Sequence, residues 1–246
     1  QNIVAIIPAR GGSKGIPKKN LIDFCGKPLV SWTISQALSV KSISTVWVTS
    51  DSKEILNVAK HLGANTISRP KSLSSDTSTT ESAWKHALNI IEEKTGSVDI
   101  VIGLQPTSPI RESNDIEQAI KIFKKSKSDS LFSAAEIGDF YIWQKKNKKL
   151  TSLNYDYDNR GRRQDYTKQY VENGSFYIFK PQILKKLNNK DLHRAFIIFS
   201  VTFIFTILII TVVPKVYHYY SEKIVIANIE KNNLITPVIV TLAEDA

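Results

Sequence analysis

The chain has 246 residues, of which 42% are hydrophobic and 23% are charged, a composition that supports a buried core and excludes an intrinsically disordered chain. Its formal net charge is +10, but the lysines occur mostly in scattered pairs. We therefore expect small anionic substrates and no nucleic-acid partner. The single cysteine, Cys25, excludes an internal disulfide framework, fits a reducing compartment, and is interpreted as a small packed side chain. Because the chain starts at Gln1 and has no methionine, we expect a fragment or a trimmed product.

The first half of the chain alternates short apolar runs with amphipathic segments. Strands are predicted at 2–9, 45–49, 65–68, 98–104 and 130–135, and helices at 28–38, 52–62 and 81–93, with a further helix that is capped by Ser113 or Asn114 and reaches about 126. This alternation predicts a Rossmann-like α/β fold, a three-layer sandwich with a mainly parallel sheet. Ligands of such sheets bind outside the carboxyl ends of the strands. The loops that should meet around one crevice are 10–20, 50–51, 72–80 and 105–109.

The composition changes at residues 139–170, which are rich in Lys, Asn, Tyr, Asp and Arg and poor in aliphatic side chains. This change predicts an extended hairpin that leaves the main domain. A strand-like pattern returns at 174–179. We therefore predict one domain at 1–190, with 139–170 as an insertion, and an atypical tail at 191–246.

The tail contains 19 consecutive residues, 195–213, without a charged side chain. This length suits a membrane-spanning helix, and the basic residues before it would place residues 1–194 on the cytoplasmic side. The chain would then be cytoplasmic and tethered to the inner face of the membrane. Two other interpretations stay open, namely a pair of buried strands and a frameshift or chimeric junction.

A glycine-rich loop follows the first strand and reads RGGSKGIPKKN from Arg10 to Asn20. Its glycines allow tight turns and offer backbone N–H groups to phosphate oxygens. Arg10 can bind a phosphate through two hydrogen bonds, and Lys14 and Lys19 add positive charge. The spacing fits neither a Walker A loop nor the dinucleotide fingerprint. By itself the loop predicts phosphate binding, with a purely structural turn as the alternative.

The longer string IIPARGGSKGIPKKN, residues 6–20, resembles the signature of the N-acylneuraminate cytidylyltransferases, the CMP-sialic acid synthetases. Further motifs follow in the order of that family. They are Ser50-Asp51, Arg69-Pro70, SDTST at 75–79, QPTSP at 105–109, RRQD at 162–165 and ENGSFY at 172–177. The resemblance covers about residues 2–181. It implies a fold like that of nucleotide-diphospho-sugar transferases, with a dimerisation hairpin.

The resemblance also implies a reaction. The anomeric hydroxyl of N-acetylneuraminic acid, or of a related nine-carbon acid such as legionaminic or pseudaminic acid, attacks the α-phosphate of CTP and releases pyrophosphate. The catalytic residues would be Arg10, Lys14 and Lys19. The nucleotide would be bound by Ala9, Arg10, Gly11, Gly12, Ser13, Lys14, Asn20, Ser78 and Thr79. The sugar would be bound by Gln105, Thr107, Ser108, Arg163 and Gln164, the last two reaching across a homodimer.

Several of these residues have local alternatives. Asn20 could cap a turn, and Ser78 and Thr79 could cap the helix that begins near residue 81. Arg163 could form a surface ion pair with Asp165, which would contribute little.

The family also carries a later Asp-x-Asp pair that binds Mg²⁺, and this chain has no such pair after Gly174. We therefore expect Mg²⁺ as a cofactor but assign it no ligand, although Asp51 or Asp76 could substitute in part. The loss of the family's last strand would also expose an apolar sheet edge. The missing pair favours a second hypothesis, a catalytically impaired, membrane-tethered nucleotide-binding module.

Overall fold

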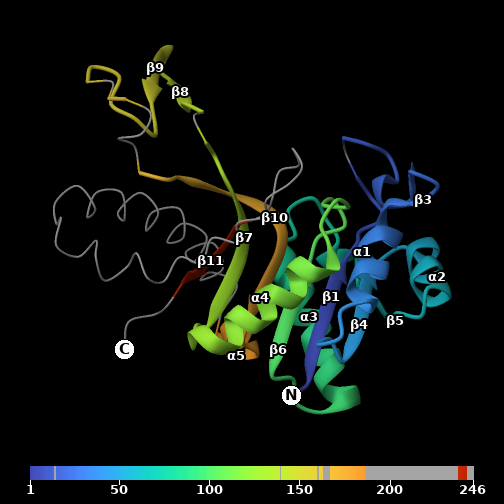
Figure 1. Ribbon diagram of the computed structural model, residues 1–246. Helices are drawn as coiled ribbons and strands as arrows, with labels where there is room; N and C mark the ends of the chain where they lie inside the picture. The colour runs from blue at the N-terminus through green and yellow to red at the C-terminus, as the bar shows by residue number, and fades with distance from the viewer. Residues whose placement is uncertain (14, 139, 160, 163–166, 187–237, 243–246) are drawn as a thin grey trace.

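A computed structural model describes residues 1–13, 15–138, 140–159, 161–162, 167–186 and 238–242. Its main sheet has seven strands in the order β11-β7-β10-β6-β1-β4-β5 (Figure 1). The strands are β1 Ile3–Pro8, β4 Thr45–Ser50, β5 Asn65–Ser68, β6 Ile100–Leu104, β7 Ser130–Glu136, β10 Tyr170–Phe179 and β11 Val238–Leu242. The pairs of β1 with β4 and β6, and of β4 with β5, are parallel. The predicted mainly parallel α/β sheet is thus confirmed.

Helices cover both faces of the sheet, as a three-layer sandwich requires. They are α1 Leu29–Leu38, α2 Lys53–His61, α3 Thr80–Thr95, α4 Ser113–Ser126 and α5 Pro181–Lys186. Strand β1 is buried on both faces, since Ile3, Ala5 and Ile7 join the core under α1, α2 and α4, while Val4 and Ile6 join the core under α3 and α5. An uninterrupted apolar run is the pattern that such a central strand needs.

Helix α4 begins differently from the sequence-based expectation. Its N-cap is Glu112 rather than Ser113 or Asn114. The Glu112 side chain accepts from the N3 backbone, and Asp115 Oδ2 accepts the Glu112 N–H at 3.1 Å. This reciprocal capping satisfies two backbone donors at once, which a single serine or asparagine cap does not.

Strand β10 is antiparallel to both of its neighbours, β6 and β7. The register of β10 with β7 shifts between Glu172 and Tyr177. Within this bulge Gly174 has φ +64°, and a Cβ there would lie 3.6 Å from Gln105 Oε1. The bulge therefore brings the ENG segment of β10 against the loop that follows β6.

Two small hairpins lie outside the main sheet. Strands β2 Asp23–Phe24 and β3 Lys27–Pro28 are joined by Cys25 and Gly26, both with positive φ, as a tight hairpin turn requires. Cys25 is exposed there, so its interpretation as a packed side chain was wrong. A turn residue points away from the core, and hydrophobic character alone does not reveal that.

The predicted hairpin within 139–170 is confirmed. It consists of β8 Trp143–Lys146 and β9 Lys149–Ser152, and Figure 1 shows it standing away from the sheet as an arm. Trp143 packs edge-on against Tyr155, with ring centroids 5.6 Å apart. The arm therefore has its own small aromatic cluster in place of the aliphatic residues that it lacks.

The expected exposed edge is not what the structure shows, because β11 pairs antiparallel with β7. This pairing satisfies the backbone groups of the β7 edge. The candidate membrane helix at 195–213 and the rest of the tail lie outside the described residues. Within the described ranges, no helix combines the length and the apolar character needed to cross a bilayer. The division at residue 190 stays a prediction.

Candidate active site

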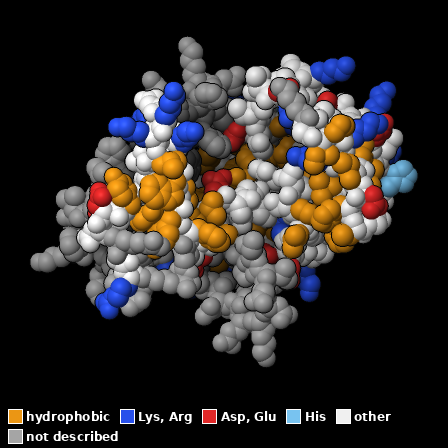
Figure 2. Space-filling view, turned by 90° about the horizontal axis from the view of Figure 1, so that it is seen from above, with side chains coloured by type: hydrophobic (Ala, Val, Ile, Leu, Met, Phe, Trp, Pro, Cys, Tyr) orange, Lys and Arg blue, Asp and Glu red, His pale blue; other side chains and the backbone are white. Residues whose placement is uncertain are grey.

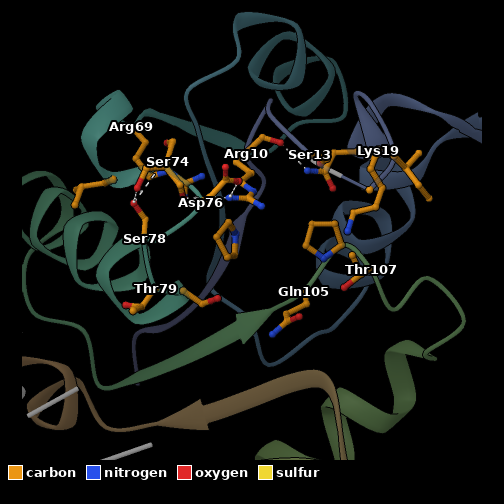
Figure 3. A pocket seen from close by; sticks show the side chains of 18 residues that line it. Arg10, Ser13, Lys19, Arg69, Ser74, Asp76, Ser78, Thr79, Gln105 and Thr107 are labelled. Atoms are coloured by element: carbon orange, nitrogen blue, oxygen red, sulfur yellow. Dashed lines mark hydrogen bonds and ion pairs between the residues drawn. The ribbon is translucent and has the colours of Figure 1, made fainter. Parts of the chain in front are cut away.

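Three of the four loops expected at the crevice line one pocket of about 630 Å³. The pocket lies between the loop after β1, the segment after β5, and the loop after β6 (Figure 3). Its polar lining includes Arg10, Ser13, Lys19, Asn20, Arg69, Ser74, Ser75, Asp76, Ser78, Thr79, Gln105 and Thr107. Residues far apart in sequence are thus brought together by the carboxyl ends of the strands.

The fourth loop, at 50–51, supports the glycine-rich loop from behind. Asp51 Oδ1 accepts the Gly11 N–H at 2.8 Å. Asn20 is 6% exposed, and its Nδ2 donates to the Arg10 carbonyl at 2.9 Å. The Gly11 N–H, which we expected to face a phosphate, is therefore already bound to a carboxylate. The Asn20 side chain thus closes this turn, as the local alternative expects, and Asn20 also lines the pocket.

Gly11 is tightly enclosed and its neighbour Gly12 is not. A Cβ on Gly11 would lie 2.9 Å from Ser52 Cβ, whereas a Cβ on Gly12 would meet nothing within 4 Å. We expect Gly11→Ala to lower the free energy of unfolding by about 1–3 kcal/mol through overpacking. Gly12→Ala should change it by less than about 1 kcal/mol. Urea unfolding of the two variants tests this, and equal losses would contradict the packing.

Two cationic side chains project into the pocket from the loop after β1. Arg10 Nη1 donates to the Ser75 carbonyl and lies 3.1 Å from Asp76 Oδ1. Figure 3 shows this pair in the middle of the pocket, with Lys19 to one side. The adjacent Lys18 points elsewhere, because its Nζ lies 3.0 Å from Glu54 Oε2. Of this lysine pair, only Lys19 is positioned to meet an anion in the pocket.

The serine-rich segment forms the opposite wall and is held by its own hydroxyl groups. Ser78 Oγ accepts from the Ser75 backbone at 3.1 Å and donates to the Ser72 carbonyl at 3.1 Å. Thr79 is the N-cap of α3, and its Oγ1 accepts from Ser82 N at 3.2 Å. The helix-cap alternative is therefore right for Thr79. Because the N-terminus of α3 meets the pocket here, its dipole also favours a bound anion.

Arg69 was noted in the sequence only as part of a motif, and the structure places it in the pocket wall. Its side chain is 6% exposed, and its Nε donates to Ser74 Oγ at 2.9 Å. Burial lowers the pKa of Arg69, Asp51 raises it, and Arg10 lowers it. The position directly after β5 was the available signal, because residues at strand ends face the crevice.

The acceptor side of the pocket is formed by the loop after β6. Gln105 and Thr107 line the pocket, whereas Ser108 does not. The Ser108 backbone carbonyl instead accepts a hydrogen bond from Arg111 Nη2. Ala9, Gly11 and Gly12 also lie outside the lining. The remaining expected site residues, Lys14, Arg163 and Gln164, lie outside the described residues.

A magnesium site was expected without assigned ligands. Among the described residues, no group of three or more His, Cys, Asp or Glu side chains could hold a metal ion. The carboxylate in the pocket lining belongs to Asp76, which is paired with Arg10, and Asp51 is bound to the glycine-rich loop. The described side chains thus form no preformed cluster of metal ligands.

Comparison with known proteins agrees with this geometry. A family model described as "Cytidylyltransferase" matches residues 4–231. The chain belongs to the cytidylyltransferase family. The match reaches 50 residues past residue 181, where the recognisable motifs end, so the resemblance extends further along the chain than those motifs indicated.

Two relatives illustrate the family. The chain is 36% identical over 183 residues to the N-acylneuraminate cytidylyltransferase of Oncorhynchus mykiss, covering 73% of this chain and 41% of that protein. It is also 36% identical over 178 residues to the pseudaminic acid cytidylyltransferase of Campylobacter jejuni, covering 71% of this chain and 76% of the relative. The chain therefore spans less than half of the first relative and about three quarters of the second.

Solved structures support the fold alone. CMP:2-keto-3-deoxy-manno-octonic acid synthetase complexed with CTP gives a TM-score of 0.58 at 20% identity, covering 75% of this chain and 76% of that chain. The 4-diphosphocytidyl-2C-methyl-D-erythritol synthase of Anaerococcus prevotii gives 0.51 at 15% identity, covering 74% and 71%. This chain thus shares its arrangement of strands and helices with both structures.

Proposed function

We propose that this chain transfers CMP from CTP to the anomeric hydroxyl of N-acetylneuraminic acid or a related nonulosonic acid, with release of pyrophosphate. The observation that carries the proposal is the pocket, whose cationic wall at Arg10 and Lys19 faces a polar wall at Gln105 and Thr107. Both relatives at 36% identity are named for nine-carbon acids of this kind.

In this proposal the pocket has a nucleotide half and an acceptor half. Arg10, Ser13 and Lys19 bind the triphosphate, and their charge stabilises the α-phosphate as pyrophosphate departs. Arg69 and the serine-rich segment hold the nucleoside beside the N-terminus of α3. Gln105 and Thr107 orient the acid so that its anomeric oxygen faces the α-phosphate, and this positioning supplies much of the rate.

The role of magnesium follows from the family and not from the described side chains. Mg²⁺ binds mainly through substrate phosphates and water, with only one or two carboxylates. The absence of an Asp-x-Asp pair after Gly174 favours the second candidate, a nucleotide-binding module with little or no transferase activity.

A pyrophosphate-release assay separates the two candidates. CTP and Mg²⁺ are incubated with the protein and with one acid at a time. The nine-carbon acids are N-acetylneuraminic, legionaminic and pseudaminic acid, and the eight-carbon acid is 2-keto-3-deoxy-manno-octonic acid. The transferase predicts release that depends on one of the nine-carbon acids. Calorimetric binding of CTP without release for any acid would replace it by the binding module. Equal release with and without acid would replace it by a nucleotide hydrolase.

We also propose that the chain acts as a homodimer through the arm. The arm exposes large apolar side chains, and the view from above shows hydrophobic groups gathered over it beside lysines (Figure 2). Leu150 is 66% exposed, as expected of a surface that a second copy would cover. Arg163 and Gln164 follow the arm in sequence and would then contribute to the partner's acceptor half.

A cytoplasmic location fits the free Cys25.

Two substitutions on opposite faces of the arm test the dimer. Leu150 pairs with Lys145 on one face, and its neighbour Thr151 pairs with Gln144 on the other. Leu150→Glu is expected to weaken self-association at least about tenfold, because it places a charge in an apolar contact. Thr151→Glu serves as the control. Sedimentation equilibrium measures both, and a monomeric parent protein or equal dissociation constants would overturn the proposal.

A further inference from the structure

Arg111 is a buried cation that the motifs did not single out. It is 7% exposed, and its guanidinium donates to three backbone carbonyls and one hydroxyl. Nη1 bonds to the Ser175 carbonyl at 2.7 Å, and Nη2 bonds to the Gln105 carbonyl at 2.6 Å. Nη2 also lies 3.0 Å from the Ser108 carbonyl and 3.0 Å from Thr33 Oγ1. One side chain thus joins the loop after β6, the bulge of β10 and helix α1.

The burial of this charge has an energetic cost that needs an explanation. Burial lowers the pKa of Arg111 to about 10, although the nearby charge of Asp115 acts in the opposite direction. The group therefore stays protonated at neutral pH. Its hydrogen bonds go to carbonyl and hydroxyl oxygens rather than to a carboxylate. A buried cation with neutral partners destabilises the fold relative to an apolar side chain. Its Nη1 and Nη2 groups, however, donate to carbonyls in the loop after β6 and in the bulge of β10, while Nε is buried without a hydrogen-bond partner among the described residues.

The segments joined by Arg111 surround the acceptor half of the pocket. Gln105, whose carbonyl accepts from Arg111, has its side chain 3.6 Å from the Cβ position of Gly174 in the bulge. Helix α1 adds a second attachment, because Gln36 Nε2 donates to the Pro109 and Arg111 carbonyls, each at 2.7 Å. The nucleotide wall at Arg10 and Lys19 makes none of these hydrogen bonds.

We propose that Arg111 is a positioning residue for the acceptor acid, one that holds Gln105 and Thr107 in register with the ENG bulge while leaving the nucleotide wall unaffected. The inference rests on the proposed transferase function. In this proposal Arg111 contacts neither substrate. It positions the acceptor acid indirectly, by holding Gln105. Lysine is not expected to replace it, because its ammonium group is a compact point charge and lacks the planar fork of donors that spans the two segments.

The test compares Arg111→Lys with Glu117→Gln. Glu117 joins α4 to Ser42, with Oε1 2.5 Å from Ser42 Oγ, so its loss also destabilises α4 but leaves the acceptor loop attached. For Arg111→Lys we expect KM for the acid to rise at least about tenfold, since displaced positioning groups lose the productive geometry. KM for CTP should stay within about twofold in both variants. Amide hydrogen exchange at 105–109 should accelerate in Arg111→Lys alone.

A second variant keeps the test decisive if Arg111→Lys does not fold. Thr33→Val removes one acceptor of the Arg111 guanidinium without changing side-chain size, and should raise KM for the acid in the same direction by a smaller factor. Equal increases in both KM values, or unchanged acid KM with faster loop exchange, would overturn the positioning role. If the parent protein shows no acid-dependent turnover, the proposed function fails instead. In that case, amide hydrogen exchange at 105–109 in Arg111→Lys still tests whether Arg111 holds the loop after β6.

Discussion

Replacement of Lys19 by glutamine is expected to lower kcat/KM for CTP by about 100-fold, the loss typical of removing one group that stabilises developing charge. The structural reason is that Lys19 lines the pocket beside Arg10 and Ser13. Glutamine keeps a polar side chain, one atom shorter than lysine, but removes the charge that a triphosphate would meet. Steady-state kinetics at fixed acid concentration measure the effect.

The neighbouring lysine provides a matched control for this prediction. Lys18 is 68% exposed and paired with Glu54 on α2, so Lys18→Gln makes the same chemical change one residue earlier in the same loop. Exposed ion pairs contribute little to stability, and kcat/KM should stay within about twofold. Similar losses in the two variants would mean that the general charge of the loop, and not the placement of Lys19, attracts the nucleotide.

The substitution with the largest expected effect on stability is Gly103→Ala in the middle of β6. A Cβ at this position would lie 2.4 Å from Trp84 Cζ2. Trp84 has little room to move, because it is 4% exposed and packs against Tyr177 and Phe179, with ring centroids 5.4 Å away in each case. We expect a loss of about 3 kcal/mol in the free energy of unfolding, at the upper end of the usual cost of overpacking.

Gly15→Ala is the control for Gly103→Ala, because a Cβ at Gly15 meets nothing within 4 Å. Its unfolding free energy should stay within about 0.5 kcal/mol of the parent value. Chemical unfolding followed by tryptophan fluorescence and by circular dichroism measures both variants. A loss below about 1 kcal/mol for Gly103→Ala would show that Trp84 can rearrange, against the tight packing described for the α3 face.

Periodicity predicted most of the sheet, since the apolar run at Ile3–Pro8 and the strands after it pack as expected. The convergence of three loops on one pocket also followed from the alternation of strands and helices. The antiparallel direction of β10 could not be predicted, because a strand's composition is the same in either direction. The pairing of β11 with β7 was equally hidden, since it joins segments more than a hundred residues apart.

The site residues could be predicted where they belong to a recognisable sequence motif. They could not be predicted where a polar group forms a hydrogen bond within the folded protein. Arg10, Lys19 and Gln105 line the pocket as expected. Gly11, however, donates to Asp51, and Asn20, although it lines the pocket, donates to the Arg10 carbonyl, because the backbone groups of a turn need hydrogen-bond partners of their own. Arg111 was missed because its hydrogen bonds go to carbonyls of the loop after β6 and of the bulge in β10, and no local spacing reveals that these segments meet.

Attack of the acid's anomeric oxygen on CTP can be observed by ³¹P NMR of the product formed from CTP and an acid labelled with ¹⁸O at the anomeric hydroxyl. We predict a new phosphodiester signal with the isotope shift of a bridging ¹⁸O, together with unlabelled pyrophosphate in equal amount. That result requires the anomeric oxygen to attack the α-phosphate. A signal without the shift, or CTP consumption that leaves the acid unchanged, would contradict the transfer of CMP to the acceptor half of this pocket.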